Sequence, residues 1–245
     1  MTDAQTLTRP DGEILALKRV KGSGPTVLWI GGFRSDMEGT KALALDATAR
    51  ERGWNFVRYD HFAHGQSSGD WRQATIGRWR EDAIALIDSL EGPVIPVGSS
   101  MGGWIALLAA LARPERIKAL VLINPAQDFT ERLMWPRLAD HERQAIVRDG
   151  ETMIVEDGLG EYVLTRHMFE EARNWLLLGQ RLSLAVPVSI LQGRNDDVVP
   201  WKHQFDLMES LEDCDLRLDL ISCGDHRLAT DADLRRIIET VARNL

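Results

Sequence analysis

Residues 94–104 read Val-Ile-Pro-Val-Gly-Ser-Ser-Met-Gly-Gly-Trp and contain the pattern Gly-x-Ser-x-Gly. An uncharged run precedes the pattern, and a helical pattern over 104–112 follows it directly. A serine between a buried strand and a helix lies on a sharp, strained turn that directs its hydroxyl out of the sheet. Gly98 and Gly102 leave room where the strand and the helix approach each other. We therefore predict that Ser100 is a nucleophile, with a structural serine in a tight turn as the alternative.

Short apolar runs alternate with helical patterns on both sides of this stretch. The runs are brief and nearly free of charge, as expected for parallel strands covered on both faces. They are residues 26–30, 54–59, 93–97, 119–123 and 188–191. Helices are predicted over 40–52 and 75–90, where apolar residues recur at helical spacing. Parallel strands need right-handed crossovers, so the predicted fold class is α/β, a mostly parallel twisted sheet with helices on both faces.

The two ends of the chain complete this architecture. Residues 7–9 and 14–20 flank Pro10-Asp11-Gly12, a turn signal that predicts an antiparallel hairpin at the edge of the sheet. Residues 216–221 are predicted as the last strand, and apolar residues over 234–241 line one side of a closing helix. A chain of 245 residues can bury one sizeable core, so we expect a single domain over 1–245.

Residues 128–185, here named the cap segment, interrupt the alternation. A helix is predicted over 136–147 and a second one over 167–178, ending before Gly179. Between them, 153–155 and 162–164 suggest a hairpin around Asp157-Gly158. A small cap inserted over the strand ends accounts for these pieces. The alternative is an extra packing layer without substrate contact, because Met and Trp stripes usually belong to a core.

A serine hydroxyl is a poor nucleophile near neutral pH, so it needs a base that a third group orients. The loop 193–200, Gly-Arg-Asn-Asp-Asp-Val-Val-Pro, follows a predicted strand and carries two adjacent carboxylates. We predict Asp196 as the orienting acid, because it lies three positions after Gly193 and leaves the two valines free to pack. Asp197 is the alternative. His226 follows the last strand, and the order serine, acid, histidine makes it the predicted base.

Attack on a carbonyl also requires hydrogen-bond donors for the oxygen that becomes negative. Met101, directly after the nucleophile, offers one backbone amide. The loop after the third strand begins Gly31-Gly32-Phe33, where the two glycines allow a sharp turn. Phe33 is the predicted second donor, and an ordinary turn at a strand end is the alternative.

The remaining histidines carry weaker signals. His203 is expected in a helix after Trp201, and two others lie in the cap segment, at positions 141 and 167. His61 and His64 are spaced like a pair of metal ligands, but no carboxylate-rich helix supports them, and Asp60 is expected to shape their loop. We therefore predict no metal ion and no organic cofactor.

Composition restricts the partners. Lys and Arg number 29 against 37 Asp and Glu, a net charge of −8, so the dense positive field that nucleic acid requires is missing. Cys214 and Cys223 make neither a disulfide framework nor a zinc spacing. Residues 1–13 have no apolar signal core, and no run of about 18 apolar residues occurs. We expect a cytoplasmic protein without a membrane span that acts on a small-molecule or acylated substrate; the oligomeric state is not specified.

Together these residues resemble the α/β-hydrolase fold family over nearly the whole chain. Residues 58–67 are similar to its Asp-x-x-Gly-x-Gly-x-Ser segment, with Ala63 in place of the first glycine. The chain also resembles the branch that contains the mitochondrial palmitoyl-protein thioesterase and acyl-glucuronide esterase. Segments that carry this resemblance are 39–42, 77–82, 98–104, 112–115, 196–201 and 225–227. Departures are the lack of a mitochondrial presequence and a divergent middle of the cap segment.

The resemblance implies that Ser100, Asp196 and His226 form a triad that hydrolyses acyl thioesters or esters through an acyl-enzyme. Activity should fall when acid protonates the histidine. Two alternatives remain open from the residues alone: a catalytically silent binding protein that kept the fold, and an esterase of small oxygen esters only. A haloalkane dehalogenase is disfavoured, because its nucleophile would be a carboxylate where Ser100 stands.

Overall fold

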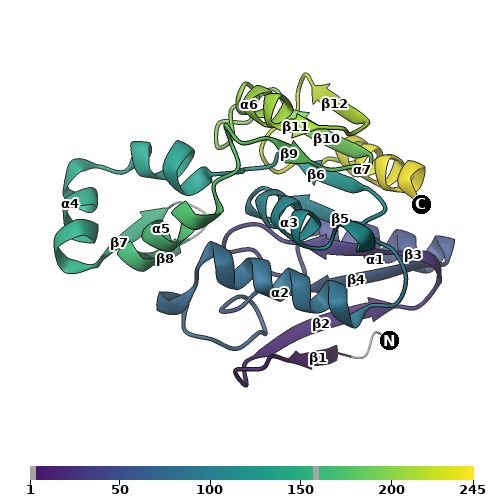
Figure 1. The fold of residues 1–245 in the computed structure, drawn as a ribbon, viewed down its shortest axis with the longest axis horizontal. Helices are drawn as coiled ribbons and strands as arrows, with labels where there is room; N and C mark the ends of the chain where they lie inside the picture. Colours follow the sequence, from purple (N-terminus) through teal and green to yellow (C-terminus); the bar gives the residue numbers. More distant parts are fainter. Residues whose placement is uncertain (1–3, 157–159) are drawn as a thin grey trace.

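The computed structural model describes residues 4–156 and 160–245. At its centre is an eight-stranded sheet with the strand order β1-β2-β4-β3-β5-β6-β10-β12 (Figure 1). These strands are β1 (Ala4–Thr8), β2 (Ile14–Val20), β3 (Ser23–Ile30), β4 (Trp54–Tyr59), β5 (Val94–Ser99), β6 (Leu120–Ile123), β10 (Val188–Gly193) and β12 (Leu216–Ile221). Each strand predicted from the apolar runs is present, with ends that differ by a few residues.

Strand direction follows the connections. β1 and β2 form an antiparallel hairpin at one edge, as the turn signal at Pro10-Asp11-Gly12 predicts, and β2 pairs antiparallel with β4. The pairs from β4 to β12 are parallel. The fold class is therefore the predicted α/β arrangement. Because β3, β5, β6, β10 and β12 run parallel, the loops at their carboxyl ends meet at one edge of the sheet.

Helices cover both faces of the sheet. They are α1 (Thr40–Arg52) and α7 (Asp231–Asn244) on one face, and α2 (Ile76–Ser89), α3 (Met101–Ala112) and α6 (His203–Ser210) on the other. Strand β3 shows the reason: Val27 and Trp29 pack with α1 and α7, while Leu28 and Ile30 belong to the other cluster. Successive side chains of a strand point to opposite faces, so an unbroken apolar run supplies both cores.

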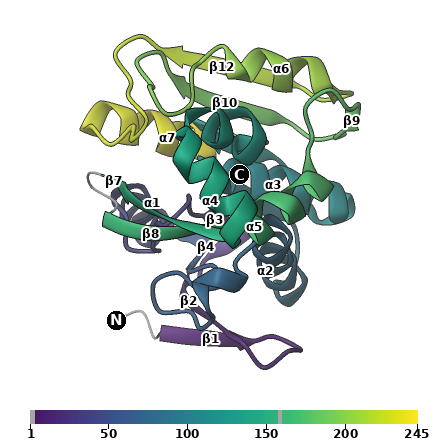
Figure 2. The same ribbon diagram turned by 90° about the vertical axis from the view of Figure 1, so that its left-hand side faces the viewer.

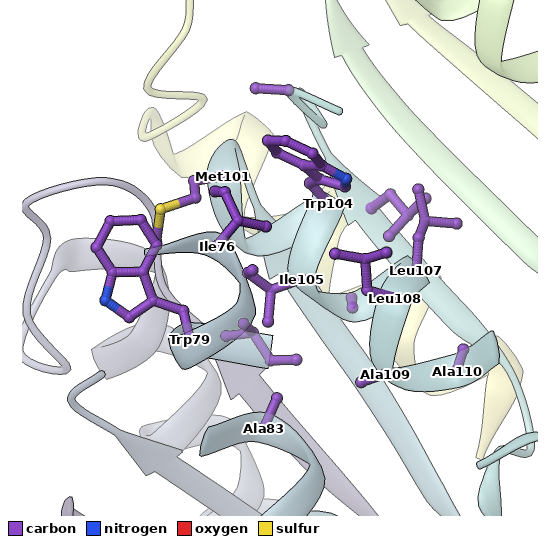
Figure 3. Packing of buried hydrophobic residues seen from close by; sticks show 14 of the residues in the cluster. Ile76, Trp79, Ala83, Met101, Trp104, Ile105, Leu107, Leu108, Ala109 and Ala110 are labelled. Carbon is purple, nitrogen blue, oxygen red and sulfur yellow. The ribbon is translucent and has the colours of Figure 1, made fainter. Parts of the chain in front are cut away.

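Helix α3 is buried almost all round, because it lies against the sheet and against α2. Its residues from Met101 to Ala110 are all buried. Figure 3 shows Trp79 and Ala83 of α2 beside Met101 and Ile105 of α3. This packing fixes the start of α3, which is where the predicted nucleophile lies.

The cap segment folds outside the sheet. It contains α4 (Asp140–Asp149), the antiparallel strands β7 (Glu151–Glu156) and β8 (Gly160–Thr165), and α5 (Arg166–Ala172). Figure 1 shows α4, β7, β8 and α5 projecting from one end of the molecule, and Figure 2 shows them in front of the body when that end faces the viewer. The expected hairpin is thus present, while its turn at Asp157-Gly158 lies outside the described residues. Two short strands that the sequence did not predict, β9 (Leu182–Ser183) and β11 (Leu211–Glu212), pair in parallel.

Both cap helices are shorter than the sequence predicts. α4 begins at Asp140 rather than at Pro136, which lies in a separate 3-10 turn, and the chain is extended at Leu138. α5 ends at Ala172 and is followed by a 3-10 turn, after which the chain is extended at Leu176 and the amides of Leu177 and Leu178 bind the buried Asp128 carboxylate instead of continuing a helix. Single-turn helices occur at Trp71–Gln73, Pro114–Arg116, Trp135–Arg137 and Arg173–Trp175, with a π-helix at Thr130–Met134.

Side-chain hydrogen bonds fasten the cap segment to the body. The indole N–H groups of Trp71 and Trp104 donate to the carbonyl oxygens of Val163 and Trp175, at 2.7 and 3.1 Å. In the part of the chain that the structure describes, no helix has the length and apolar character needed to cross a membrane.

Gly102 supports a first prediction. A Cβ at this position would lie 2.1 Å from the carbonyl oxygen of Ile30, a backbone atom of a central strand that cannot move aside. We expect Gly102→Ala to lower the free energy of unfolding by about 3 kcal/mol or more, measured by urea denaturation. Gly39→Ala is the matched control, since its nearest neighbour would be 3.7 Å away, and it should cost less than about 1 kcal/mol. Equal losses in the two variants would contradict the close approach of α3 to β3 at Gly102.

Candidate active site

Ser100 occupies a strained turn between β5 and α3. Its φ of 55° and ψ of −123° lie in a region that residues with a side chain rarely adopt. Backbone hydrogen bonds hold it there: its amide donates to Ile123 at 2.9 Å, and its carbonyl accepts the amides of Gly103 and Ala126 at 2.8 and 3.0 Å. The turn expected from Gly-x-Ser-x-Gly is therefore present, with Ser100 at the carboxyl end of a central strand.

Asp196 and His226 meet across the ends of β10 and β12. Nδ1 of His226 lies 2.8 Å from Oδ2 of Asp196, whose side chain has no exposed surface. The other carboxylate oxygen accepts the amides of Val198 and Val199 at 2.9 and 2.7 Å. Because a carboxylate oxygen only accepts, Nδ1 carries a proton, and in the neutral ring Nε2 then has the free lone pair. The geometry brings Asp196 rather than the exposed Asp197 to the imidazole.

The two valines of this loop do not behave alike. Both were expected to fold back and pack, and Val199 is fully buried. Val198, by contrast, is 43% exposed, so the expectation is wrong for this residue. The two amides that bind one carboxylate oxygen force the chain through a tight turn, which points only one of two successive side chains inward.

Asn124 is a structural part of the site that the sequence patterns did not indicate. It follows β6 directly, is fully buried and has a φ of 43°. Its Nδ2 donates to the carbonyl oxygens of Asp225 and His226 at 3.0 and 2.9 Å, and its Oδ1 accepts the Gly193 amide at 2.7 Å. One side chain thus joins the loop that begins at Gly193 to the loop of His226. An asparagine at the end of a fully apolar strand was the available signal.

Lys41, in the first turn of α1, holds the other side of the same loop. Its ammonium group donates to the carbonyl oxygen of Arg227, the residue after the histidine. Burial lowers the pKa of Lys41 to about 8, although the carboxylate of Asp225 acts in the opposite direction. The histidine loop is therefore fastened from two elements that are far apart in the sequence.

Phe33 and Met101 lie at the two positions predicted for oxyanion donors. Met101 is the first residue of α3, where backbone N–H groups have no partner within the helix. Phe33 lies inside a turn that the Ser35 amide closes by donating to the Gly32 carbonyl at 3.1 Å. A Cβ on Gly32 would lie 3.3 Å from Cβ of Ser100, which shows how closely this turn approaches the serine.

A cavity of about 790 Å³ connects these groups. Ser100, His226, Phe33 and Met101 all line it, whereas Asp196 lies behind the histidine. Most of its wall is apolar, and the cap segment supplies a large part of that wall: Phe129, Leu133, Met134, Leu138, Ile154, Val155, Tyr162 and Leu164. The charged residues that line it are Arg137, Glu142, Asp197, Asp225 and Arg227. The volume suits a small organic ligand, and the cap segment contacts the same space as the serine.

His61 and His64 contact the backbone of the turn at residues 31–35, and they are 1% and 4% exposed. Each of their ring nitrogens has a protein partner within 3.3 Å. Burial lowers their pKa values to about 3 and about 4, respectively, so both rings are neutral near pH 7. Asp60 shapes the loop, as expected, by accepting the amides of Met37 and Gln66 at 2.7 and 2.8 Å.

The other histidines lie away from Ser100. His203 begins α6, and its Nε2 is 2.8 Å from the carbonyl oxygen of Gln127. His141 and His167 are exposed on the cap segment. Of the six histidines, all of which lie within the described ranges, His226 is the one that lines the cavity beside Ser100.

A mostly parallel sheet with a strained serine after a central strand and a histidine after the last one defines the class of α/β hydrolases. A family model described as "Serine aminopeptidase, S33" matches residues 25–168, more than half of the chain. The chain belongs to this family of α/β hydrolases.

Relatives that match nearly the whole of this chain specify the kind of α/β hydrolase. The mitochondrial palmitoyl-protein thioesterases ABHD10 of Bos taurus and Homo sapiens are each 34% identical over 98% of this chain and 79% of their own length. The solved structure of alpha/beta hydrolase domain-containing protein 10 from mouse is 33% identical, covers 98% of this chain and 97% of its own, and has a TM-score of 0.90. A solved structure from Agrobacterium vitis S4 is 36% identical over 100% of this chain and 98% of its own, with a TM-score of 0.92. The resemblance seen in the sequence is confirmed, and the chain is a hydrolase of esters or thioesters.

The cytoplasmic location expected from the sequence is corrected by these relatives, which are named as mitochondrial proteins. That expectation depended on charge, cysteine content and residues 1–13. A compartment is specified by a targeting segment that can be removed after import, so the folded domain keeps no physical record of it.

Burial of His64 predicts a pH-dependent stability. The ordinary pKa of histidine is 6.5, and burial lowers that of folded His64 to about 4. Between these values the unfolded chain binds a proton that the folded chain does not, so the stability present above pH 6.5 is lost as the pH falls. In urea denaturation, the advantage of the wild type over His64→Gln should shrink by up to about 1.4 kcal/mol per pH unit between about pH 6 and 4.5.

The wild type is compared with His64→Gln because buried carboxyl groups have the opposite effect on the pH dependence of the free energy of unfolding. Burial raises the pKa of three carboxyl groups, which take up protons in the folded state as the pH falls: Asp60, Asp82 and Asp128. These contributions are common to both proteins and cancel in the difference. A difference that is the same at pH 7 and pH 5 would contradict the burial of a neutral His64.

Proposed function

We propose that Ser100, His226 and Asp196 act as a catalytic triad that hydrolyses thioesters and esters through an acyl-enzyme. The observation that carries this proposal is the 2.8 Å contact between His226 and the buried Asp196, beside a cavity that Ser100 also lines. Amides of Phe33 and Met101 are the proposed oxyanion donors. Membership in the hydrolase family supports the proposal.

The chemistry follows from these positions. Nε2 of His226 takes the proton of the Ser100 hydroxyl while its oxygen bonds to the acyl carbon. The carbonyl oxygen becomes negative and is stabilised by the two amides. The tetrahedral intermediate then expels the thiolate or alkoxide, which receives the proton from the imidazolium. A water molecule, deprotonated by the same histidine, attacks the acyl-enzyme and releases the carboxylic acid and Ser100.

The cavity and the relatives favour acyl thioesters with a long apolar chain. Relatives of the chain are named palmitoyl-protein thioesterases, and the cap segment makes most of the wall next to the serine apolar. A thiol has a pKa of about 8.5, so it leaves with less help from the histidine than an alkoxide needs. We infer that the acyl chain lies along the cap side of the cavity. The small acyl group of a short oxygen ester would leave most of this apolar wall without contact.

Replacement of Ser100 tests the triad. Ser100→Ala should abolish labelling by a fluorophosphonate and lower the hydrolysis of p-nitrophenyl acetate by about 10³-fold or more, because the nucleophile is removed. Ser99→Ala is the matched control: it removes the neighbouring hydroxyl, and both activities should remain. Thermal denaturation should show that each variant is folded. Labelling that survives in Ser100→Ala would overturn the assignment of the nucleophile, whereas a wild type that is neither labelled nor active would favour the catalytically silent binding protein.

A paired substrate series tests the substrate class. Matched oxygen esters and S-acyl thioesters, from acetyl to palmitoyl, should show kcat/KM rising with chain length because more apolar surface is buried in the cavity. Met134→Trp, on the cap side of the wall, should shift the preference toward shorter chains. If kcat/KM of the wild type is highest for short oxygen esters and does not rise with chain length, the thioesterase proposal is contradicted and the triad assignment is unaffected.

A further inference from the structure

The turn at residues 31–35, here named the oxyanion turn, contains a residue in a strained backbone conformation. Arg34, directly after Phe33, has a φ of 56°, in the left-handed region that side chains disfavour. The Ser35 amide closes the turn with a single bond to Gly32. Because the Phe33 amide is one of the proposed oxyanion donors, groups outside the turn that hold the neighbouring peptides set the direction of this N–H.

His64 supplies one such group. Its Nε2 lies 3.1 Å from the backbone nitrogen of Arg34, and its Nδ1 lies 3.0 Å from the carbonyl oxygen of Phe62. The carbonyl can only accept, so Nδ1 carries the proton, and Nε2 must accept the Arg34 N–H. The partners therefore assign one neutral tautomer, in which the ring holds the peptide that follows Phe33.

His61 supplies a contact on the other side of the turn. Its Nε2 lies 3.3 Å from the carbonyl oxygen of Gly31, and its Nδ1 lies 3.2 Å from the hydroxyl of Tyr59. Nε2–H is then the donor, and Nδ1 accepts the tyrosine hydroxyl. The two imidazoles bind backbone groups on either side of Gly32 and Phe33.

The surrounding aromatic rings restrict both the His64 imidazole and the Phe33 side chain. Trp71 and Trp79 pack against His64, with ring centroids 5.4 Å apart in both pairs. The same two tryptophans pack against the Phe33 ring, at 5.3 and 6.1 Å. The side chain of Phe33 and the imidazole that holds its backbone thus share one pair of neighbours, which fixes them relative to each other.

Both histidines are nearly inaccessible to water, and burial lowers the pKa of each well below 6.5. The charged group facing His64 is the Arg34 guanidinium, which also disfavours a second positive charge. His61 is faced by His64. A protonated His64 would present an N–H to the Arg34 N–H, so the contact with the turn requires the neutral ring.

We propose that His64 is a positioning residue of the active site, whose neutral imidazole aims the Phe33 amide at the oxyanion, with His61 fixing the start of the same turn. This inference rests on the proposed function, because it requires an oxyanion to be stabilised. An amide that is misdirected weakens an interaction made mainly in the transition state. Loss of the His64 contact should therefore lower kcat and leave KM nearly unchanged.

His64→Gln and His64→Asn both introduce an amide side chain, and they differ in the length of that side chain. In His64→Gln the Oε1 atom can take the place of Nε2 and accept the Arg34 N–H, whereas the shorter side chain in His64→Asn places its oxygen near the Nδ1 position. We expect kcat for a p-nitrophenyl ester to fall about 10- to 100-fold in His64→Asn, with KM within about 2-fold of wild type, and to recover most of this loss in His64→Gln. His167→Gln, at an exposed histidine of the cap segment, should match the wild type.

Two readouts separate positioning from general damage. Rates are divided by the concentration of sites that a fluorophosphonate labels to completion, so that unfolded protein does not count. The affinity for an aliphatic trifluoromethyl ketone, which forms an oxyanion on the serine, should fall in His64→Asn in parallel with kcat. A wild-type kcat per labelled site in His64→Asn, a loss confined to KM, or equal impairment of the folded Asn and Gln variants would overturn the proposal.

The Ser100 and His64 variants distinguish failure of the triad assignment from failure of the positioning role. Turnover that survives in Ser100→Ala means that the proposed function has failed. An inactive Ser100→Ala together with an unaffected His64→Asn means that only the positioning role has failed.

Discussion

The site depends on the close approach of three backbone segments around Ser100. The serine keeps a positive φ because Ile123, Gly103 and Ala126 bind its backbone, and Gly102 brings α3 within contact of β3. Strain of this kind persists only where the surroundings determine the conformation. The fully buried helix α3 and the parallel strands on both sides of β5 provide that rigidity.

The other groups of the site are held by the same device, a buried polar side chain that binds backbone groups. Asp196 binds the turn that carries it, Asn124 joins the acid and base loops, and His64 binds the oxyanion turn. Leaving a buried polar atom without a partner costs free energy, so each of these contacts is strongly favoured over its loss. Loops that would otherwise be mobile are thereby fixed to the edge of the sheet, which is the condition for a preorganised site.

The cap segment supplies a large part of the wall of the cavity beside Ser100. Trp71 and Trp104 of the body donate to backbone carbonyls of the cap segment, and within the segment the Asp128 carboxylate binds the amides of Leu177 and Leu178. Most of the cavity wall that it supplies is apolar. In this arrangement Ser100 and His226 belong to the body, whereas much of the apolar wall beside them belongs to a segment outside the sheet.

The sequence by itself determined the strands of the eight-stranded sheet, the helices of the body and the class of enzyme, because apolar periodicity and the glycines around Ser100 are local signals. It also specified the loops in which an acid and a base occur. Only the tertiary structure distinguished Asp196 from Asp197, shortened the cap helices, and gave Asn124 and His64 their contacts. Those outcomes depend on which backbone groups meet across long stretches of chain, and no spacing within one segment encodes them. The compartment was decided by neither, because it is a property of a targeting segment rather than of the folded domain.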